Sequence, residues 1–256
     1  MRSLRAFVGK EVLELVRTGR LYIYLCIFLL FGILNPAIAK ITPWIMEMSA
    51  ERLADTGFII TEIKVDALDS WVQFYKNLPI LIIVFVILSG NTLTGECQKG
   101  TLIHMLTKGL QRWKVIAAKG LALAALWSIC YWLYFGITYG YTAYFWDNGI
   151  ASYLLMGAAC PYLFGIWMIA AIFLISVFCN GNTAVLSGCG GLAVISYLLG
   201  MIPDAAEYLP TKLLSSGELL SGGILPSEYV KALVVTGILS AAFLGAAVVG
   251  FNRKSL

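Results

Sequence analysis

Long apolar runs, separated by short polar segments, make up most of the chain. An α-helix rises about 1.5 Å per residue, so about 20 apolar residues cross the roughly 30 Å hydrocarbon layer of a bilayer. Runs of this length cover residues 21–41, 78–95, 120–146, 153–179, 183–202 and 232–251. Lipid cannot satisfy exposed backbone groups, so each run is expected to cross as a helix. The pattern predicts an all-α, polytopic membrane protein with six transmembrane helices.

Composition supports this prediction and excludes a soluble domain. The chain has 256 residues, of which 60% are hydrophobic and 12% are charged, whereas soluble domains carry about 25% charged residues. A chain this apolar could not cover its own surface with polar groups in water. We expect a single membrane domain over residues 1–256.

The charged residues indicate the orientation of the six helices. An even number of spans places both termini on one side, together with segments 96–119 and 180–182. That side carries twelve basic and three acidic residues, whereas the other side carries six basic and eleven acidic residues. Lys and Arg concentrate on the cytoplasmic side of membrane proteins. Both termini are therefore predicted to be cytoplasmic.

The cysteines and the histidine indicate neither a disulfide framework nor a metal site. Five cysteines lie in predicted spans, and Cys97 begins a cytoplasmic segment. A disulfide framework would need cysteines in external loops, so the cysteines are interpreted as small apolar packing residues. His104 stands without a catalytic or metal-ligating constellation and is interpreted as a solvated residue.

The first 20 residues are predicted to form an amphipathic helix in the headgroup layer. One helical face comprises Leu4, Val8, Val12 and Leu15, and the basic residues include Arg5, Lys10 and Arg17. Such a helix buries its apolar face at the interface and is anchored there by its cations. It serves either as a membrane anchor alone or as a docking elbow for a cytoplasmic partner, and the segment by itself favours the anchor.

Two external segments interrupt the spans. Residues 43–76 are polar and acidic, and their aromatic side chains are interpreted as a belt at the membrane interface. These are Trp44, Phe58, Trp71, Phe74 and Tyr75. Residues 203–228 contain three prolines around two apolar patches, and Pro and Gly interrupt helices. Two short half-helices that dip into the outer leaflet are predicted there, with a surface loop as the alternative. Asn35-Pro36 and Cys160-Pro161 predict kinks or helix ends inside spans.

The cytoplasmic segment 96–114 is predicted to hold a short amphipathic helix. Thr101 can cap its start, and Leu102, Met105 and Leu106 share one face at i, i+3, i+4 spacing. Gly109 can end it in the left-handed conformation. A helix held between two spans can act as a lever, because a partner that pushes it moves both spans.

This segment resembles the permeases of type-2 ABC exporters. In those proteins the second span ends at an acidic residue, followed by Gly-Thr-Leu, a short coupling helix, an Arg, and a Lys in the next span. The matching residues here are Glu96, Gly100-Thr101-Leu102, Leu106, Arg112 and Lys119. The amphipathic elbow, the six spans, the broken external segment and the basic tail extend the resemblance over the whole chain. Gly109-Leu110 stands where the family often has a proline, which leaves the end of the coupling helix open.

The resemblance implies that a separate chain hydrolyses ATP. This chain lacks a G-x-x-x-x-G-K-[ST] phosphate loop, so it is expected to be no enzyme and to hold no cofactor, with ATP and Mg on the partner. Two ATPase subunits would bind the elbow and the coupling segment, and a second permease copy or a paralogue would complete the pathway in a bacterial plasma membrane. No nucleic acid partner is expected. The implied ATPase-coupling residues are Glu96, Gly100, Thr101, Leu102, Met105, Leu106 and Arg112, with Arg5, Lys10 and Arg17 on the elbow.

Glu96 has two interpretations that the sequence leaves equal. It is either a solvated or Lys99-paired acid at a span end, or a carboxylate bonded to the elbow or to a neighbouring helix. The glycine cluster Gly188, Gly190 and Gly191 lies inside an apolar span, without a following Lys, and is interpreted as a site of close helix packing.

Alternative functions are weighed by the polar residues that each requires. An ion-coupled secondary transporter normally has buried charges in mid-span, and an intramembrane enzyme needs paired catalytic groups; neither pattern is visible. An apolar pathway suits an amphipathic or hydrophobic cargo. In its size, and in having no external domain, the chain resembles permeases that export bacterial peptides, including lantibiotics and phenol-soluble modulins. Small drugs, lipids and sodium ions are the alternative substrates.

Overall fold

The computed structural model describes residues 2–54, 65–107, 109, 111–179 and 181–254, and these residues form helices and connecting turns without a strand. Six helical segments are long and apolar enough to cross a membrane, which confirms the predicted number of spans. They are α2 (Arg20–Ala54), α3 (Ala67–Ser89) continued by α4 (Asn91–Gln98), α6 (Arg112–Phe145), α7 (Leu154–Phe178), α8 (Asn182–Leu199) and α10 (Ser227–Arg253).

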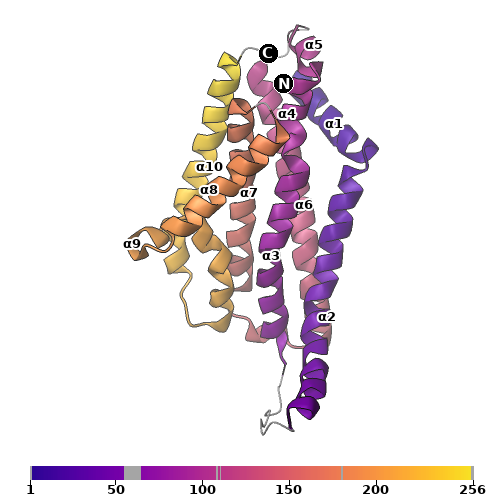
Figure 1. The fold of residues 1–256 in the computed structure, drawn as a ribbon, viewed down its shortest axis with the longest axis vertical. Coiled ribbons are helices and arrows are strands. Elements are labelled where there is room, and N and C mark those ends of the chain that lie inside the picture. Colours follow the sequence, from indigo (N-terminus) through magenta and orange to yellow (C-terminus); the bar gives the residue numbers. More distant parts are fainter. Residues whose placement is uncertain (1, 55–64, 108, 110, 180, 255–256) are drawn as a thin grey trace.

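The shorter elements lie at the ends of this bundle. They are α1 (Arg2–Arg17), α5 (Thr101–Thr107), η1 (Asn148–Ile150), α9 (Pro203–Ala206) and η2 (Pro210–Ser221). Helices α1, α4 and α5 and the end of α10 gather at one end of the molecule, as an even number of spans requires (Figure 1). We call this the coupling end.

Helix α2 is much longer than the predicted first span. It runs for 35 residues and continues through Pro36 and Pro43, and it extends beyond its neighbours at the end opposite α5 (Figure 1). The prediction of a loop from residue 43 is therefore wrong, because helical structure continues to Ala54. The buried Asn35 side chain bonds Thr138 on α6 at 3.0 Å, which ties α2 to the bundle one residue before the first proline.

Helix α3 begins earlier than predicted because its start is capped. The Asp66 carboxylate accepts a hydrogen bond from the Leu68 amide, and the Asp69 carboxylate accepts one from the Asp66 amide. These reciprocal bonds satisfy amide groups that a helix start otherwise leaves open. The early start moves Trp71 and Phe74 into the protein.

The predicted aromatic belt is thus correct only in part. Trp44 is exposed as a belt residue would be, but Trp71 and Phe74 are fully buried. Phe74 stacks on Tyr134 of α6, with ring centroids 4.4 Å apart. They are core residues because α6 presents aromatic partners to them, a fact that composition alone does not show. Phe58 lies outside the described residues.

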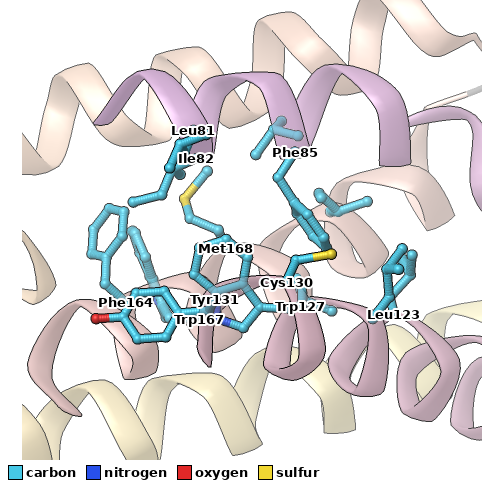
Figure 2. Close-up of a cluster of buried hydrophobic side chains, with 14 of the residues drawn as sticks. Leu81, Ile82, Phe85, Leu123, Trp127, Cys130, Tyr131, Phe164, Trp167 and Met168 are labelled. Carbon is cyan, nitrogen blue, oxygen red and sulfur yellow. The ribbon is translucent and has the colours of Figure 1, made fainter. Parts of the chain in front are cut away.

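Helices α3, α6 and α7 enclose the centre of the core. Figure 2 shows Phe85 of α3, Trp127 and Tyr131 of α6 and Trp167 of α7 among these side chains. Trp127 packs edge-on against Phe85 at 5.1 Å between centroids. A Cβ at Gly165 of α7 would lie 2.1 Å from the Trp127 ring, so only glycine lets α7 approach α6 here. We call these side chains the aromatic core.

The segment before the last span contains two short helices, α9 and the 3₁₀ helix η2. Leu213, Leu219 and Leu220 are buried, and Ser216 donates a hydrogen bond to the Gly157 carbonyl of α7 at 2.9 Å. The η2 part of the segment is therefore packed onto the bundle and is not a free surface loop, whereas α9 has no buried residue. The depth of the segment in the bilayer stays a prediction.

Candidate functional site

The elbow helix α1 packs against the coupling end through a face that includes a charge. Among the α1 side chains that the structure describes, Phe7 and Glu11 are buried, whereas Val12 is 46% exposed. The bundle-facing side keeps Leu4, Val8 and Leu15 of the predicted apolar face, which pack on the core, but it leaves out Val12. It includes Glu11, which bonds Lys119 of α6. Gly19, at φ +73°, allows the turn into α2, since glycine adopts the left-handed region without a side-chain penalty.

Two glycine turns hold α5 between α4 and α6. Gly100 has φ +67° and Gly109 has φ +89°, and the Gly109 amide bonds the Leu106 carbonyl at 3.0 Å. The predicted left-handed end of the coupling helix is confirmed. Thr101 differs from its predicted role as a cap, because its hydroxyl donates to the Glu96 carbonyl at 3.3 Å. That bond fastens the start of α5 to the end of α4.

Five charged side chains from α1, α4 and α6 meet beside these turns. Lys119 Nζ lies 2.8 Å from Glu11 Oε2 and 3.0 Å from Glu96 Oε2. Lys10 Nζ lies 2.6 Å from Glu96 Oε1, 3.0 Å from Glu14 Oε2 and 3.1 Å from Glu11 Oε1. The two oxygens of Glu96 thus contact different lysines on different helices. We call these five residues the charge cluster.

Burial makes this cluster sensitive to the loss of Lys119 or Glu11. The Lys119 side chain is 1% exposed and that of Glu11 is 6% exposed. Burial works against the charge of Lys10, but hydrogen bonds with Glu96 and Glu14 outweigh it and raise the pKa of Lys10 above its ordinary value. Lys10 therefore remains charged at neutral pH. Removing Lys119 would leave the buried Glu11 carboxylate without its closest cation.

The three carboxylates come close enough to raise the question of a metal ion. Oxygens of Glu11, Glu14 and Glu96 lie within 4.8 Å of one another, a spacing that a divalent cation can bridge. The ammonium groups of Lys10 and Lys119 already lie against these oxygens. We therefore assign the cluster to holding helices together and derive no metal site from it.

The comparison with known families agrees with this architecture. A family model described as ABC-2 family transporter protein matches residues 5–256. The chain belongs to the ABC-2 transporter family. Among curated proteins, none matches it. It is accordingly a multi-pass transmembrane subunit of an ABC exporter, and the family implies an ABC ATPase as its partner. The family is one of transport subunits, so its members are not themselves the catalytic chain.

In this ABC-2 permease, Glu96 follows the second of its two interpretations. Its carboxylate is bonded to Lys10 of the elbow and to Lys119 of α6, and no ion pair with Lys99 occurs among the described residues. Glu11 and Glu14 were not among the predicted site residues, and Lys119 was named only as a residue that matches the family pattern. A signal for Glu11 existed, because a carboxylate at position 11 shares the helical face of Leu4 and Leu15.

The predicted ATPase-coupling residues of the permease lie in different surroundings. Leu102 is fully buried and Leu106 is partly buried, and both pack on the core. Arg112 donates to backbone carbonyls at the end of α10. Arg5 and Arg17 are exposed on α1. The side chain of Met105 lies outside the described residues, and the contact of all these residues with an ATPase stays a prediction.

Proposed function

We propose that this permease forms half of an export pathway for amphipathic or hydrophobic peptides, driven by ATPase subunits that press on α1 and α5. Two copies, or one copy and a paralogue, enclose the pathway. One observation carries the proposal: a wholly apolar groove beside α8, a helix that its own chain leaves largely uncovered.

Helix α8 is buried to a much smaller extent than a core helix. Only 17% of its apolar stretch is buried, against 67% for α7, and it runs obliquely across the bundle (Figure 1). Val194, Ile195 and Leu198 are all more than half exposed. An apolar face at this position is available to lipid, to a second permease subunit or to cargo.

The groove between α3, α7 and α8 has a volume of ≈ 250 Å³. Its lining residues are apolar and include Ile83 and Ile87 of α3, Met168 of α7 and Ala193 of α8. Such a surface offers contact area without fixed charges, which favours cargo recognised by its apolar face over a small hydrophilic ion.

Contact with the ATPase is expected at the outer side of α5. Because Leu102 faces the core, that leucine fixes the helix to the permease. The exposed residue Thr107 is on the accessible side. A push on α5 is then transmitted through Leu102 and through the bond from Thr101 to α4.

Transport into inverted membrane vesicles tests the substrate. Vesicles containing the permease and its copurifying ATPase should take up a labelled amphipathic helical peptide when ATP is supplied. The control peptide has the same charge but polar residues in place of its apolar face, and its uptake should be at background. Uptake of a small drug or of sodium without peptide uptake would replace the peptide proposal by one of the alternatives.

Photo-crosslinking tests the contact with the ATPase. A photoreactive residue at Thr107 should crosslink to the ATPase. One at Tyr144, which is 80% exposed and lies at the end of α6 opposite Arg112, should not. Crosslinking from position 144 alone would place the ATPase at the wrong end and contradict the proposal.

A further inference from the structure

Arg112 makes contacts that a surface docking residue does not need. It is the first residue of α6, and its Nη1 donates to the Phe251 carbonyl at 3.0 Å and to the Asn252 carbonyl at 3.4 Å. The same nitrogen also donates to the Lys254 carbonyl. The last carbonyls of a helix have no partner within that helix, so Arg112 supplies donors to the end of α10.

The placement of this guanidinium is explained by α10 and not by α6. The N-terminus of a helix carries partial positive charge, which disfavours a cation, whereas the C-terminus favours one. Arg112 lies at the start of α6 and against the end of α10. Its interaction with the neighbouring helix thus outweighs the unfavourable one with its own.

The end of α10 is in turn fixed to α7. Lys254 Nζ donates to the Cys179 carbonyl, which follows the last residue of α7, at 3.3 Å. A Cβ on Gly250 would lie 2.8 Å from Val177 Cγ1, so glycine allows the two helices to touch here. Phe251 is fully buried. The cytoplasmic ends of α10 and α7 therefore form one packed unit, and Arg112 is attached to it.

Arg112 is also close in sequence to the coupling helix. It follows Gly109, whose left-handed turn ends α5, by three residues. A displacement of α5 that moves the start of α6 must either move the end of α10 with it or break the hydrogen bonds of Arg112. The charge cluster offers no such path, because its five residues lie on α1, α4 and α6.

We infer that Arg112 is a positioning residue that transmits movement of α5 to the cytoplasmic ends of α10 and α7. The inference rests on the proposed function, in which an ATPase presses on α5. It replaces the interpretation of Arg112 as an ATPase contact. The first half of the bundle is then moved through the charge cluster, and the second half through Arg112.

Hydrogen exchange in the assembled complex tests this role. The permease with its ATPase is compared without nucleotide and with a non-hydrolysable ATP analogue, as wild type, Arg112→Gln and Arg112→Lys. The control is Arg253→Gln, which removes a nearby exposed cation of α10. Without nucleotide, amides of residues 250–253 should exchange about tenfold faster in Arg112→Gln, because the helix end frays. The control should change exchange far less than Arg112→Gln, because an exposed cation contributes only a solvent-screened charge to the helix end.

The response to nucleotide separates transmission from simple stabilisation. In the wild type, the analogue should change exchange in both α5 and residues 250–253. In Arg112→Gln the α5 response should remain and the α10 response should fall at least about threefold, with Arg112→Lys in between because one ammonium reaches fewer carbonyls. An unchanged α10 response in both variants would overturn the inference. If α5 of the wild type does not respond to nucleotide, the proposed coupling fails, and the inference fails with it.

Discussion

The aromatic core and the Lys119–Glu11 pair of the charge cluster are both buried, and both use α6, but they hold the helices together in different ways. Trp127 of the core and Lys119 of the cluster lie about two turns apart on that helix. In lipid, burial of apolar surface gives helices little reason to associate, so close packing and polar bonds decide which helices are neighbours. In the aromatic core, rings packed against one another and against glycines fix how closely the helices approach. In the charge cluster, opposite charges join the helices, and a buried charge that loses its partner is destabilising.

The largest effect is expected from Lys119→Met. It would leave the buried Glu11 carboxylate without its closest cation, and breaking a buried ion pair costs about 3–5 kcal/mol. The unfolding midpoint of the purified permease should fall sharply, and protease should gain access to α1. Lys99→Met, an exposed cation in the neighbouring turn, should change neither measurement.

A second substitution distinguishes charge from shape in this prediction. If the cost arises from an uncompensated carboxylate, Glu11→Gln added to Lys119→Met should recover part of the lost stability. Equal stability of Lys119→Met and wild type would contradict the assignment of the cluster as a helix-joining element.

The aromatic core is expected to be destabilised when a side chain is enlarged. In Gly165→Ala the new Cβ would overlap the Trp127 ring, which is held by Phe28, Phe85 and Tyr131 on its other sides. Overpacking of this kind costs about 1–3 kcal/mol. The matched control is Gly191→Ala in α8, where a Cβ meets nothing within 4 Å among the described residues. Thermal unfolding should separate the two variants, and equal midpoints would disprove the close approach of α7 to α6.

A polar pair between spans should contribute less than either region. Ser70 of α3 and Thr142 of α6 are buried with their hydroxyl oxygens 2.7 Å apart. Hydrogen bonds between transmembrane helices contribute about 0.6 kcal/mol on average. Thr142→Val keeps the side-chain shape and should lower stability by about that amount in equilibrium unfolding. A loss comparable to that of Gly165→Ala would show that polar bonds dominate here as they do in the cluster.

The number of spans and the coupling helix could be predicted from the sequence because both depend on local properties. Apolar run length sets a span, and Gly109 marks a helix end by its conformational freedom. The residues at which the spanning helices begin and end were predicted less accurately. Because Asp66 and Asp69 cap it, α3 begins at Ala67 and not at residue 78, and α2 continues through two prolines.

Contacts between distant segments could not be derived from one sequence. Glu96 and Lys10 are 86 residues apart, and the sequence alone left open whether Glu96 is solvated or bonded to the elbow. Helices α7 and α8 are both apolar enough to span, yet only the arrangement of the bundle makes the first a core helix and leaves the second uncovered. Trp71 looked like an interfacial residue for the same reason, since Phe135, against which its ring packs, lies on α6.

The smallest effect is expected at a charge pair outside both regions. Glu207 Oε2 and Lys231 Nζ lie 2.6 Å apart, and both side chains are about half exposed. The hydrogen bond from Lys231, and then its charge, lower the pKa of Glu207. A lowered pKa adds stability above the pKa of the unfolded chain, and that stability is lost as pH falls through the folded value.

Solvent screens an exposed pair, so the unfolding midpoints of Glu207→Gln and wild type should coincide at neutral pH and stay close at pH 4. The two curves are compared across this range so that effects of pH on the rest of the protein, which are the same in both, cancel. Any difference should be largest at neutral pH and shrink in acid. A gap as wide as that of Lys119→Met would show that exposure does not separate the two kinds of ion pair.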